Sequence, residues 1–323
     1  MIRTSACQVL GIDHPIVQSG MAGGYTSPEL VAAVSNAGGL GVLGCLDRSP
    51  ERARDDIDRI RSLTDRPFGV NFVLHLRNEE TFRVCLDQKV PVFSFFRGDP
   101  ETPVKQAHAA GAKVIHQITT VQEARQACDV GVDVLVAQGC EGGGHVGLLP
   151  LMSLLPEVVA AAGSRPVLAA GGIVDGRGLA AAMCLGAAGV LMGTRFLATE
   201  ECSVSAIHKQ EILKAGLGDT VASGEDGVWD MLWGHDWPGI QVRAIRNAMA
   251  DWIGREDELR AVLDQEREKF RRAYAEGDRS RMALLAGVGA GRIDRLQPAA
   301  EVVREIVAEA ERILGRLARE AVQ

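Results

Sequence analysis

The segment that decides the fold reads Val132-Asp133-Val134-Leu135-Val136-Ala137-Gln138-Gly139-Cys140-Glu141-Gly142-Gly143-Gly144-His145-Val146-Gly147. Its apolar first part, 132–136, is typical of a buried parallel strand. Five glycines then occur in the nine positions 139–147. Glycine adopts positive φ and lets a ligand approach the backbone closely, and His145 is the side chain here that titrates near neutral pH. We therefore expect an active site at the carboxyl end of a parallel strand, with a mobile surface loop carrying a solvated histidine as the alternative.

The alternation of apolar strands and amphipathic helices continues on both sides of this segment. Ser27-Pro28-Glu29, for example, combines an N-cap serine, a proline at the first helical position and an acid in the first turn. About eight such units in roughly 200 residues predict an α/β fold of the (β/α)8 TIM-barrel type. A doubly wound open sheet is the alternative, and the lack of a GxGxxG motif after the first strand counts against it. The expected strands are 14–18, 40–44, 68–74, 90–96, 113–118, 132–137, 166–173 and 189–196.

The alternation stops after Thr199. Residues 223–239 are rich in Trp, Gly and Asp and are expected to form a loop, whereas the charged block 240–282 is expected to be helical. We expect this part to form a C-terminal helical subdomain over the barrel mouth, on the substrate side. A last amphipathic helix, 298–317, would bury its apolar residues through Leu317 against the barrel. The expected divisions are 1–208 for the barrel, 209–282 for the helical substrate or lid subdomain, and 283–323 for the return segment and final helix.

The composition favours a soluble α/β enzyme. Of the 323 residues, 46% are hydrophobic and only 4% are aromatic, which suits a packed α/β core better than a β-sandwich. The formal net charge of −7 argues against a nucleic-acid partner, because such proteins usually present a basic face. Neither a signal peptide nor a membrane-spanning run is evident, so we expect a cytoplasmic protein with no membrane partner.

The seven cysteines are scattered and form no CxxC or other metal-binding spacing. Reduced thiols in a cytosolic protein are the simplest interpretation. Cys140 lies near the expected site, where a small apolar loop residue is favoured over a catalytic thiol. No two histidines are spaced as metal ligands with a carboxylate, so no metal is predicted. Histidines expected to be solvated or hydrogen-bonded without a functional role are His14, His75, His108, His208 and His235, with His116 in the core.

Two glycine-containing loops, Ala170-Gly171-Gly172 and Met192-Gly193-Thr194, follow the seventh and eighth expected strands. In TIM barrels a phosphate commonly lies on these two loops. Exposed backbone N–H groups and the Thr194 hydroxyl suit a phosphate better than a sugar or a metal. Ordinary turn glycines are the alternative.

The other strand ends offer uncharged groups, namely Met21-Ala22, Asn71, Gln117 and Gln138. Amides, carbonyls and small side chains of this kind suit the edges of a planar heterocycle such as an isoalloxazine. The barrel mouth is therefore expected to offer a phosphate site beside a site for a planar heterocycle.

With these motifs the chain resembles the nitronate monooxygenase (2-nitropropane dioxygenase) family of FMN-dependent barrels. The flavin-dependent enoyl-acyl carrier protein reductase II and flavin NAD(P)H:quinone reductases share the barrel and its Gly-Gly-His or Gly-His element. Two departures stand out: the usual Glu-Ala-Gly-Gly-His is Glu141-Gly142-Gly143-Gly144-His145 here, and Val288 stands where family members often have Gln. The matching segments are Pro15–Gly24, Ala37–Gly44, Pro67–Asn71, Ala137–Gly147, Ala169–Arg177, Leu185–Thr199 and the late glycine motif Ala286–Gly291.

The resemblance implies a role for each matching position. His145 corresponds to the catalytic base. Gly144 would lie close to the FMN cofactor, and Ala170 and Met192 would flank the phosphate-binding glycines. The residues implied at the flavin ring are Gly20, Met21 and Ala22, with Asn71, Gln117 and Gln138 at its polar edges; those implied at the phosphate are Gly171, Gly172, Gly193 and Thr194.

The implied reaction is oxidation of an alkyl nitronate by dioxygen with release of nitrite. The nitronate gives one electron to FMN, and for a neutral nitroalkane His145 would first remove the α-proton. One alternative is an NAD(P)H-dependent reductase acting on a quinone or an enoyl thioester, and another is a flavin-binding protein without turnover. The partners expected are a small-molecule substrate and dioxygen, with NAD(P)H and a homodimer left open.

Overall fold

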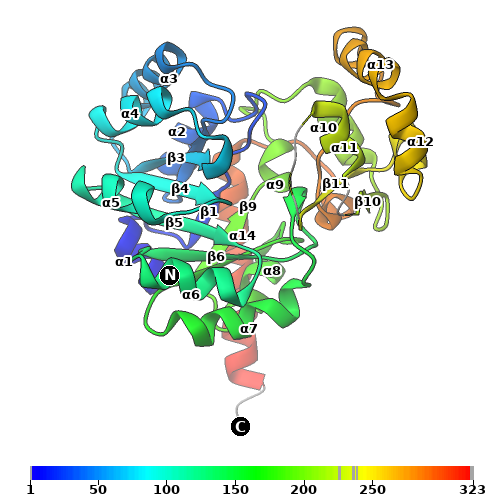
Figure 1. Ribbon diagram of the computed structural model, residues 1–323. Helices are drawn as coiled ribbons and strands as arrows, with labels where there is room; N and C mark the ends of the chain where they lie inside the picture. Colours follow the sequence, from blue (N-terminus) through cyan, green and yellow to red (C-terminus); the bar gives the residue numbers. More distant parts are fainter. Residues whose placement is uncertain (1, 225–226, 235–236, 238, 321–323) are drawn as a thin grey trace.

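The computed structural model describes residues 2–224, 227–234, 237 and 239–320, and it has a parallel barrel at its centre (Figure 1). Eight parallel strands are hydrogen-bonded in the order β1-β9-β8-β6-β5-β4-β3-β2. A parallel bridge between Val17 and Leu40 joins β1 to the segment that enters β2 and so closes the ring. The predicted (β/α)8 barrel is therefore confirmed. Its strands are β1 (Ile16–Gln18), β2 (Gly41–Gly44), β3 (Phe68–Val73), β4 (Val92–Phe96), β5 (Lys113–Ile118), β6 (Val134–Gln138), β8 (Val167–Ala170) and β9 (Gly189–Met192).

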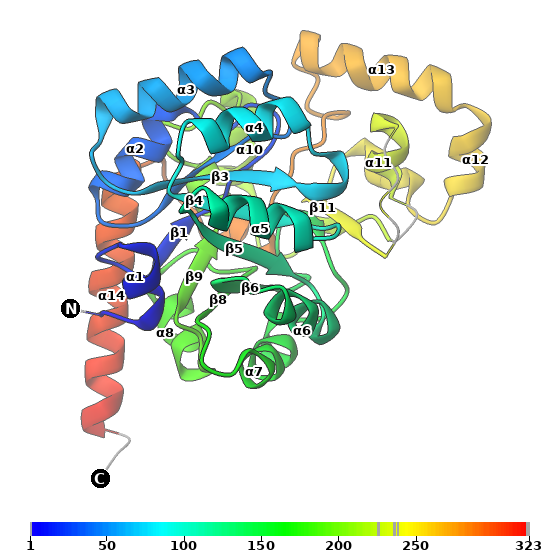
Figure 2. The same cartoon turned by 60° about the vertical axis from the view of Figure 1, so that its left-hand side comes forward.

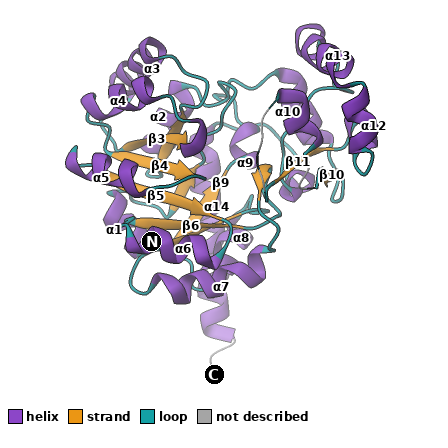
Figure 3. Cartoon of the chain, viewed as in Figure 1, coloured by secondary structure: helices purple, strands orange, loops and turns teal. Residues whose placement is uncertain are grey.

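Helices cover the outside of this ring (Figures 1 and 3). The predicted start at Ser27-Pro28 is confirmed, because the Ser27 hydroxyl accepts a hydrogen bond from the Leu30 N–H at 3.0 Å and Pro28 is the first helical residue. The covering helices are α2 (Pro28–Asn36), α3 (Pro50–Leu63), α4 (Glu79–Asp87), α5 (Glu101–Ala109), α6 (Val121–Asp129), α7 (Leu151–Ala162), α8 (Gly176–Cys184) and α14 (Ala299–Glu320), with a 3-10 turn η1 (Leu74–Leu76) after β3.

A short helix that the sequence analysis missed, α1 (Ser5–Leu10), closes the amino-terminal end of the barrel. Its buried Ala6 and Leu10 pack in one apolar cluster with residues near the beginnings of strands, such as Val92 and Val134. Close packing at this end leaves the carboxyl ends of the strands as the open end.

The final helix α14 packs mainly on α8 and α2 and runs along the barrel, as Figure 2 shows. Val303, Ile306, Val307 and Ala310 are buried as predicted. Leu317, at 39% exposure, is not, and that part of the prediction is wrong. None of the described helices is both long and apolar enough to cross a membrane.

The chain after β9 differs most from expectation. The apolar run predicted as a strand to residue 196 ends at Met192, and α9 (Thr194–Leu197) follows it. The expected loop 223–239 contains α11 (Val228–Trp233), and the expected helical block begins with a strand, β11 (Gln241–Ile245). The other elements here are α10 (Ala206–Lys214), β10 (Thr220–Ala222), η2 (Ala248–Trp252), α12 (Glu256–Ala261), α13 (Leu263–Glu276) and η3 (Val288–Arg292).

The glycine-rich loop itself contains a strand, β7 (Gly144–Val146). It pairs antiparallel with β11, placing Val242 opposite His145, and β11 pairs in turn with β10. The resulting three-stranded sheet, β10-β11-β7, stands beside the barrel in Figure 3 and joins the loop to the segment after β9. The alternative of a mobile loop with a solvated histidine is therefore wrong.

Candidate active site

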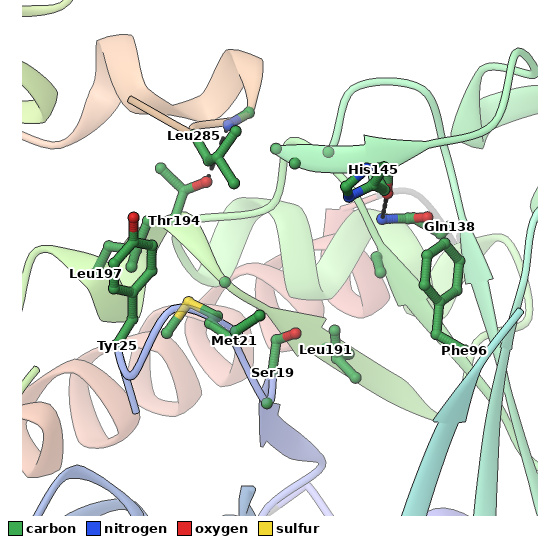
Figure 4. A pocket seen from close by; sticks show the side chains of 18 of the residues that line it. Ser19, Met21, Tyr25, Phe96, Gln138, His145, Leu191, Thr194, Leu197 and Leu285 are labelled. Carbon is green, nitrogen blue, oxygen red and sulfur yellow. Dashed lines mark hydrogen bonds between the residues drawn. The ribbon is translucent and has the colours of Figure 1, made fainter. Parts of the chain in front are cut away.

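A cavity of about 490 Å³ lies at the carboxyl ends of the barrel strands. Figure 4 shows it with side chains from several strand ends directed into one space. The structure thus brings together every residue that the sequence analysis placed in the site. These are Gly20, Met21, Ala22, Asn71, Gln117, Gln138, Gly144, His145, Ala170, Gly171, Gly172, Met192, Gly193 and Thr194.

Glycines form the wall of the cavity after β8 and β9. Gly171 and Gly172 have φ of +113° and +69°, so both need glycine, and successive N–H groups in such conformations make an anion-binding concavity. A Cβ at Gly193 would meet only the Met21 sulfur at 3.7 Å and Ser19 Cβ at 3.8 Å. The backbone therefore leaves room beside this wall for a bound group.

The late glycine motif completes that wall. The Thr194 hydroxyl accepts a hydrogen bond from the Gly287 N–H at 3.0 Å, which leaves its own O–H free to donate to a ligand. The Val288 N–H donates to the Glu141 carbonyl at 3.0 Å. Neither Lys nor Arg occurs among the described residues that line the cavity, so N–H and hydroxyl groups are the donors available to an anion there.

Amides lie at the barrel side of the cavity. The Asn71 amide donates to the Ser94 carbonyl at 3.2 Å, and the Gln138 amide donates to the His145 carbonyl at 3.1 Å, a bond drawn in Figure 4. The Gln138 Oε1 atom is buried without a hydrogen-bond partner. An unpartnered buried acceptor costs free energy, on the order of 1–3 kcal/mol, until a donor reaches it. Gln138 therefore suits the N–H edge of a planar heterocycle.

His145 lies between two groups from the segment after β9. Its Nε2 is 2.8 Å from the Asp230 Oδ1, and the two side chains are 17% and 8% exposed. Its ring stacks on Trp237 with centroids 3.8 Å apart and planes 17° apart, while Trp233 lies farther off at 6.0 Å. Asp230, Trp233 and Trp237 were not among the predicted site residues. For Asp230 and Trp233 the signal was their three-residue spacing, which places both on one helix face.

Apolar side chains cover the cavity near His145. Val73, Phe96 and Trp237 form a buried cluster with Ile240, and the first three line the cavity. Two tyrosines, Tyr25 and Tyr274, line it as well. Burial, with the nearby Cys202 and Asp47, raises the pKa of Tyr25, so this phenol stays neutral at physiological pH and can donate a hydrogen bond.

Cys140 is not among the described residues that line the cavity. Its carbonyl accepts a hydrogen bond from Arg243 Nε at 2.9 Å. Burial and the neighbouring Glu141 raise the pKa of its thiol, which disfavours the thiolate needed for nucleophilic attack. All seven cysteines are unpaired.

Among the described residues, no group of three His, Cys, Asp or Glu side chains could hold a metal ion. His108 contacts Asp133 at 2.8 Å, and His208 lies 3.0 Å from the Leu285 carbonyl. His116 is buried, as expected of a core histidine. His235 lies outside the described residues.

Comparison with known proteins places this geometry in a family. A family model described as nitronate monooxygenase matches residues 3–82 and 77–309. A protein from Staphylococcus saprophyticus named probable nitronate monooxygenase is 37% identical, over 69% of this chain and 76% of its own length. The solved nitroalkane oxidase from Streptomyces ansochromogenes is 29% identical, with a TM-score of 0.81 over 97% of this chain and 100% of that chain.

Relatives with other names are just as similar. The solved FabK from Thermotoga maritima is 36% identical, with a TM-score of 0.85 over 98% of this chain and 99% of that chain. A protein from Mycobacterium tuberculosis named (3aS,4S,5R,7aS)-5-hydroxy-7a-methyl-1-oxo-octahydro-1H-indene-4-carboxyl-CoA dehydrogenase is 41% identical over 69% of this chain, and the match spans 63% of that protein. The names dehydrogenase, nitroalkane oxidase and nitronate monooxygenase all denote oxidoreductases. Because the model matches nearly the whole chain, the chain belongs to the nitronate monooxygenase family.

Proposed function

We propose that this chain binds FMN in the barrel cavity and oxidises alkyl nitronates with dioxygen, releasing nitrite. One observation carries the proposal: a single cavity joins the Gly171-Gly172 and Gly193-Thr194 wall to His145. The wall supplies donors for one phosphate, and His145 supplies an imidazole whose free nitrogen can accept a proton.

The residues present fit a flavin mononucleotide. Gly171, Gly172, Gly193 and Thr194 would hold its phosphate, since a concavity of N–H groups and a hydroxyl suits an anion. The buried Gln138 Oε1, which lacks a partner, would accept from an N–H of the ring. FMN, when bound, accepts electrons from the substrate. At the ring we also propose Gly20, Met21, Ala22, Asn71, Gln117 and Gly144, with Ala170 and Met192 beside the phosphate loops.

In this proposal His145 acts before oxidation. A neutral nitroalkane must lose its α-proton to become a nitronate, and a neutral imidazole is a suitable base. A preformed nitronate has already lost that proton and does not need the base. His145 therefore extends the substrate range from nitronates to neutral nitroalkanes.

We propose that the segment 209–282 forms the substrate side of the site. Asp230 is hydrogen-bonded to His145, and Trp233, Trp237 and Tyr274 line the cavity. The rings supply apolar surface near the base, which favours a substrate with an apolar substituent and keeps water from the reacting carbon.

A second candidate is an NAD(P)H-dependent reductase for a quinone, an enoyl thioester or another acyl thioester. The similarity to FabK over 98% of this chain, and to the CoA dehydrogenase at 41% identity, supports it. His145 would then protonate or polarise the acceptor instead of removing a proton.

Anaerobic reduction separates the candidates. The purified protein, loaded with FMN, is mixed in parallel with propionate 3-nitronate and with NADH or NADPH, and the flavin absorbance is followed. Bleaching by nitronate alone, with nitrite released once air is admitted, supports the monooxygenase. Rapid bleaching by a nicotinamide, followed by reoxidation with a quinone or a crotonyl thioester, supports the reductase. Bleaching by neither leaves a flavin-binding protein without turnover and contradicts both.

A further inference from the structure

Two segments far apart in the chain meet at the His145 ring. His145 belongs to β7, and its Nε2 contacts Asp230 of α11, 85 residues later, at 2.8 Å. Both side chains are largely buried, so little water competes for this contact. We infer that Asp230 is a positioning residue that holds neutral His145 with its proton on Nε2 and its lone pair on Nδ1. This inference rests on the proposed function, in which His145 is the base.

The direction of the contact follows from the chemistry of the two groups. An ionised carboxylate can only accept hydrogen bonds, so Nε2 must carry the hydrogen. In the neutral ring, Nδ1 is then the nitrogen that can accept a proton. Trp237 stacks on the ring at 3.8 Å and restricts its rotation about the bond to Asp230. Together the two contacts fix both the tautomer and the plane of the imidazole.

The Asp230 carboxylate lies against Gly227, which has no side chain. A Cβ at Gly227 would lie 2.7 Å from the Asp230 Oδ2, so a larger residue at 227 would displace the carboxylate. Arg267 Nε donates to the Met231 carbonyl at 2.9 Å and ties α13 to α11. Asp230 lies on the side of α11 that faces His145, which it contacts through its Oδ1.

The sheet β10-β11-β7 joins the strand that carries His145 to the segment that carries Asp230. Val242 of β11 lies opposite His145 in the register, and its N–H donates to the Ser223 hydroxyl at 3.0 Å, just before α11. The site of the base His145 is therefore assembled from the glycine loop and the later segment together.

When a neutral nitroalkane reacts, the bond from its α-carbon to hydrogen breaks, the electron pair stays on the nitronate, and the proton moves to Nδ1 of His145. The resulting imidazolium lies beside the Asp230 carboxylate, which stabilises its charge.

The tautomer can be measured without any turnover. The flavin-loaded protein is labelled with 15N at the histidine rings, and long-range 1H–15N spectra are recorded in mildly alkaline buffer, where imidazoles are neutral. The His145 signals are assigned by their loss in His145→Asn. We expect a protonated Nε2 and an unprotonated Nδ1 in the wild type. Asp230→Asn and Asp230→Ala should lose this single form, because neither side chain forces the hydrogen onto Nε2.

A matched control removes a different buried carboxylate from the same segment. Glu266 of α13 is 5% exposed and pairs with Lys269 and Arg281, away from the cavity. Glu266→Gln should therefore keep the wild-type tautomer. The inference is overturned if wild-type Nε2 lacks a hydrogen, if both Asp230 variants keep the wild-type tautomer, or if Glu266→Gln changes it as much as they do.

A kinetic measurement separates this inference from the proposed function. If His145 is the base, Asp230→Asn should lower turnover of a neutral nitroalkane roughly 10-fold or more, as expected for a misplaced general base. Turnover of the preformed nitronate should fall less than about threefold, and flavin content should not change. Equal losses on both substrates contradict the positioning role. A wild-type protein that turns over neither substrate contradicts the proposed function, while the tautomer result stands by itself.

Discussion

Replacing Gly193 by Asp should abolish tight FMN binding while leaving the barrel folded. Gly193 has φ of −104°, which any residue adopts, and an added Cβ would meet nothing closer than 3.7 Å. The fold therefore tolerates a side chain here, and that side chain enters the space beside the expected phosphate. Two unit charges about 4 Å apart repel by about 4 kcal/mol at an effective dielectric constant of about 20. Since about 1.4 kcal/mol corresponds to a tenfold change in the dissociation constant, the affinity for FMN should fall about 1000-fold.

The matched variant is Gly193→Asn, which has nearly the shape of Asp but no charge. Apo-proteins of the wild type and both variants are titrated with FMN, and binding is followed by quenching of flavin fluorescence. The melting temperature of each apo-protein tests the fold. We expect Gly193→Asn to bind FMN far more tightly than Gly193→Asp. Equal affinities of the two variants would show that no phosphate lies beside Gly193.

Three further predictions concern the cofactor, the base and the buried histidines. Flavin released by heat should migrate as FMN on chromatography, because the cavity offers one phosphate wall; recovery of FAD would contradict this. His145→Asn should lower turnover of neutral nitroalkanes about 100-fold or more, and of preformed nitronate much less, in a steady-state comparison on one preparation. Equal losses would mean that His145 is not the base. Burial lowers the pKa of His116 and of His208 to about 4, from an ordinary value of 6.5. As the pH falls, each histidine is protonated in the unfolded chain before it is protonated in the folded protein. The free energy of unfolding therefore falls between about pH 6.5 and pH 4, by about 2 kcal/mol for each histidine at about pH 5. Urea unfolding at about pH 7 and pH 5 should show a smaller difference in His208→Gln than in the wild type; an unchanged difference would refute the assignment.

The barrel could be predicted because its signals are local. Ser27 caps a helix and Pro28 starts it, and the apolar run 132–136 precedes a glycine turn, so each element can be identified without its neighbours. Most of the cavity residues followed from the rule that parallel strands in a closed barrel end on one face, whereas Gly20 and Gly144 were implied by the family resemblance. Local sequence patterns did not locate the end of a strand where apolar residues continued beyond it. The strand β9 ends at Met192, but apolar residues resume with Phe196 and Leu197 in α9, so the apolar pattern did not mark where the strand ends.

The missed elements depend on contacts between distant parts of the chain. Gly144-His145-Val146 has little strand propensity and becomes a strand because β11 pairs with it. The alternation in Gln241–Ile245, with Val242 and Ala244 buried, was the signal for β11, but the charged residues around it favoured a helix. Asp230 likewise gains its role from the fold, since nothing near it in the sequence shows that it meets His145.

The glycines of the loop serve close packing rather than mobility. A Cβ at Gly143 would lie 2.5 Å from the Gly287 nitrogen, and one at Gly147 would lie 2.5 Å from Thr119 Cβ. Gly144, with φ of +72°, turns the chain into β7. At Gly142, where members of the family usually have Ala, an added Cβ would lie 3.3 Å from the Gln138 amide nitrogen, which is a tight contact. That amide donates a hydrogen bond to the His145 carbonyl. Glycine at position 142 therefore leaves room for the hydrogen bond that holds the His145 backbone.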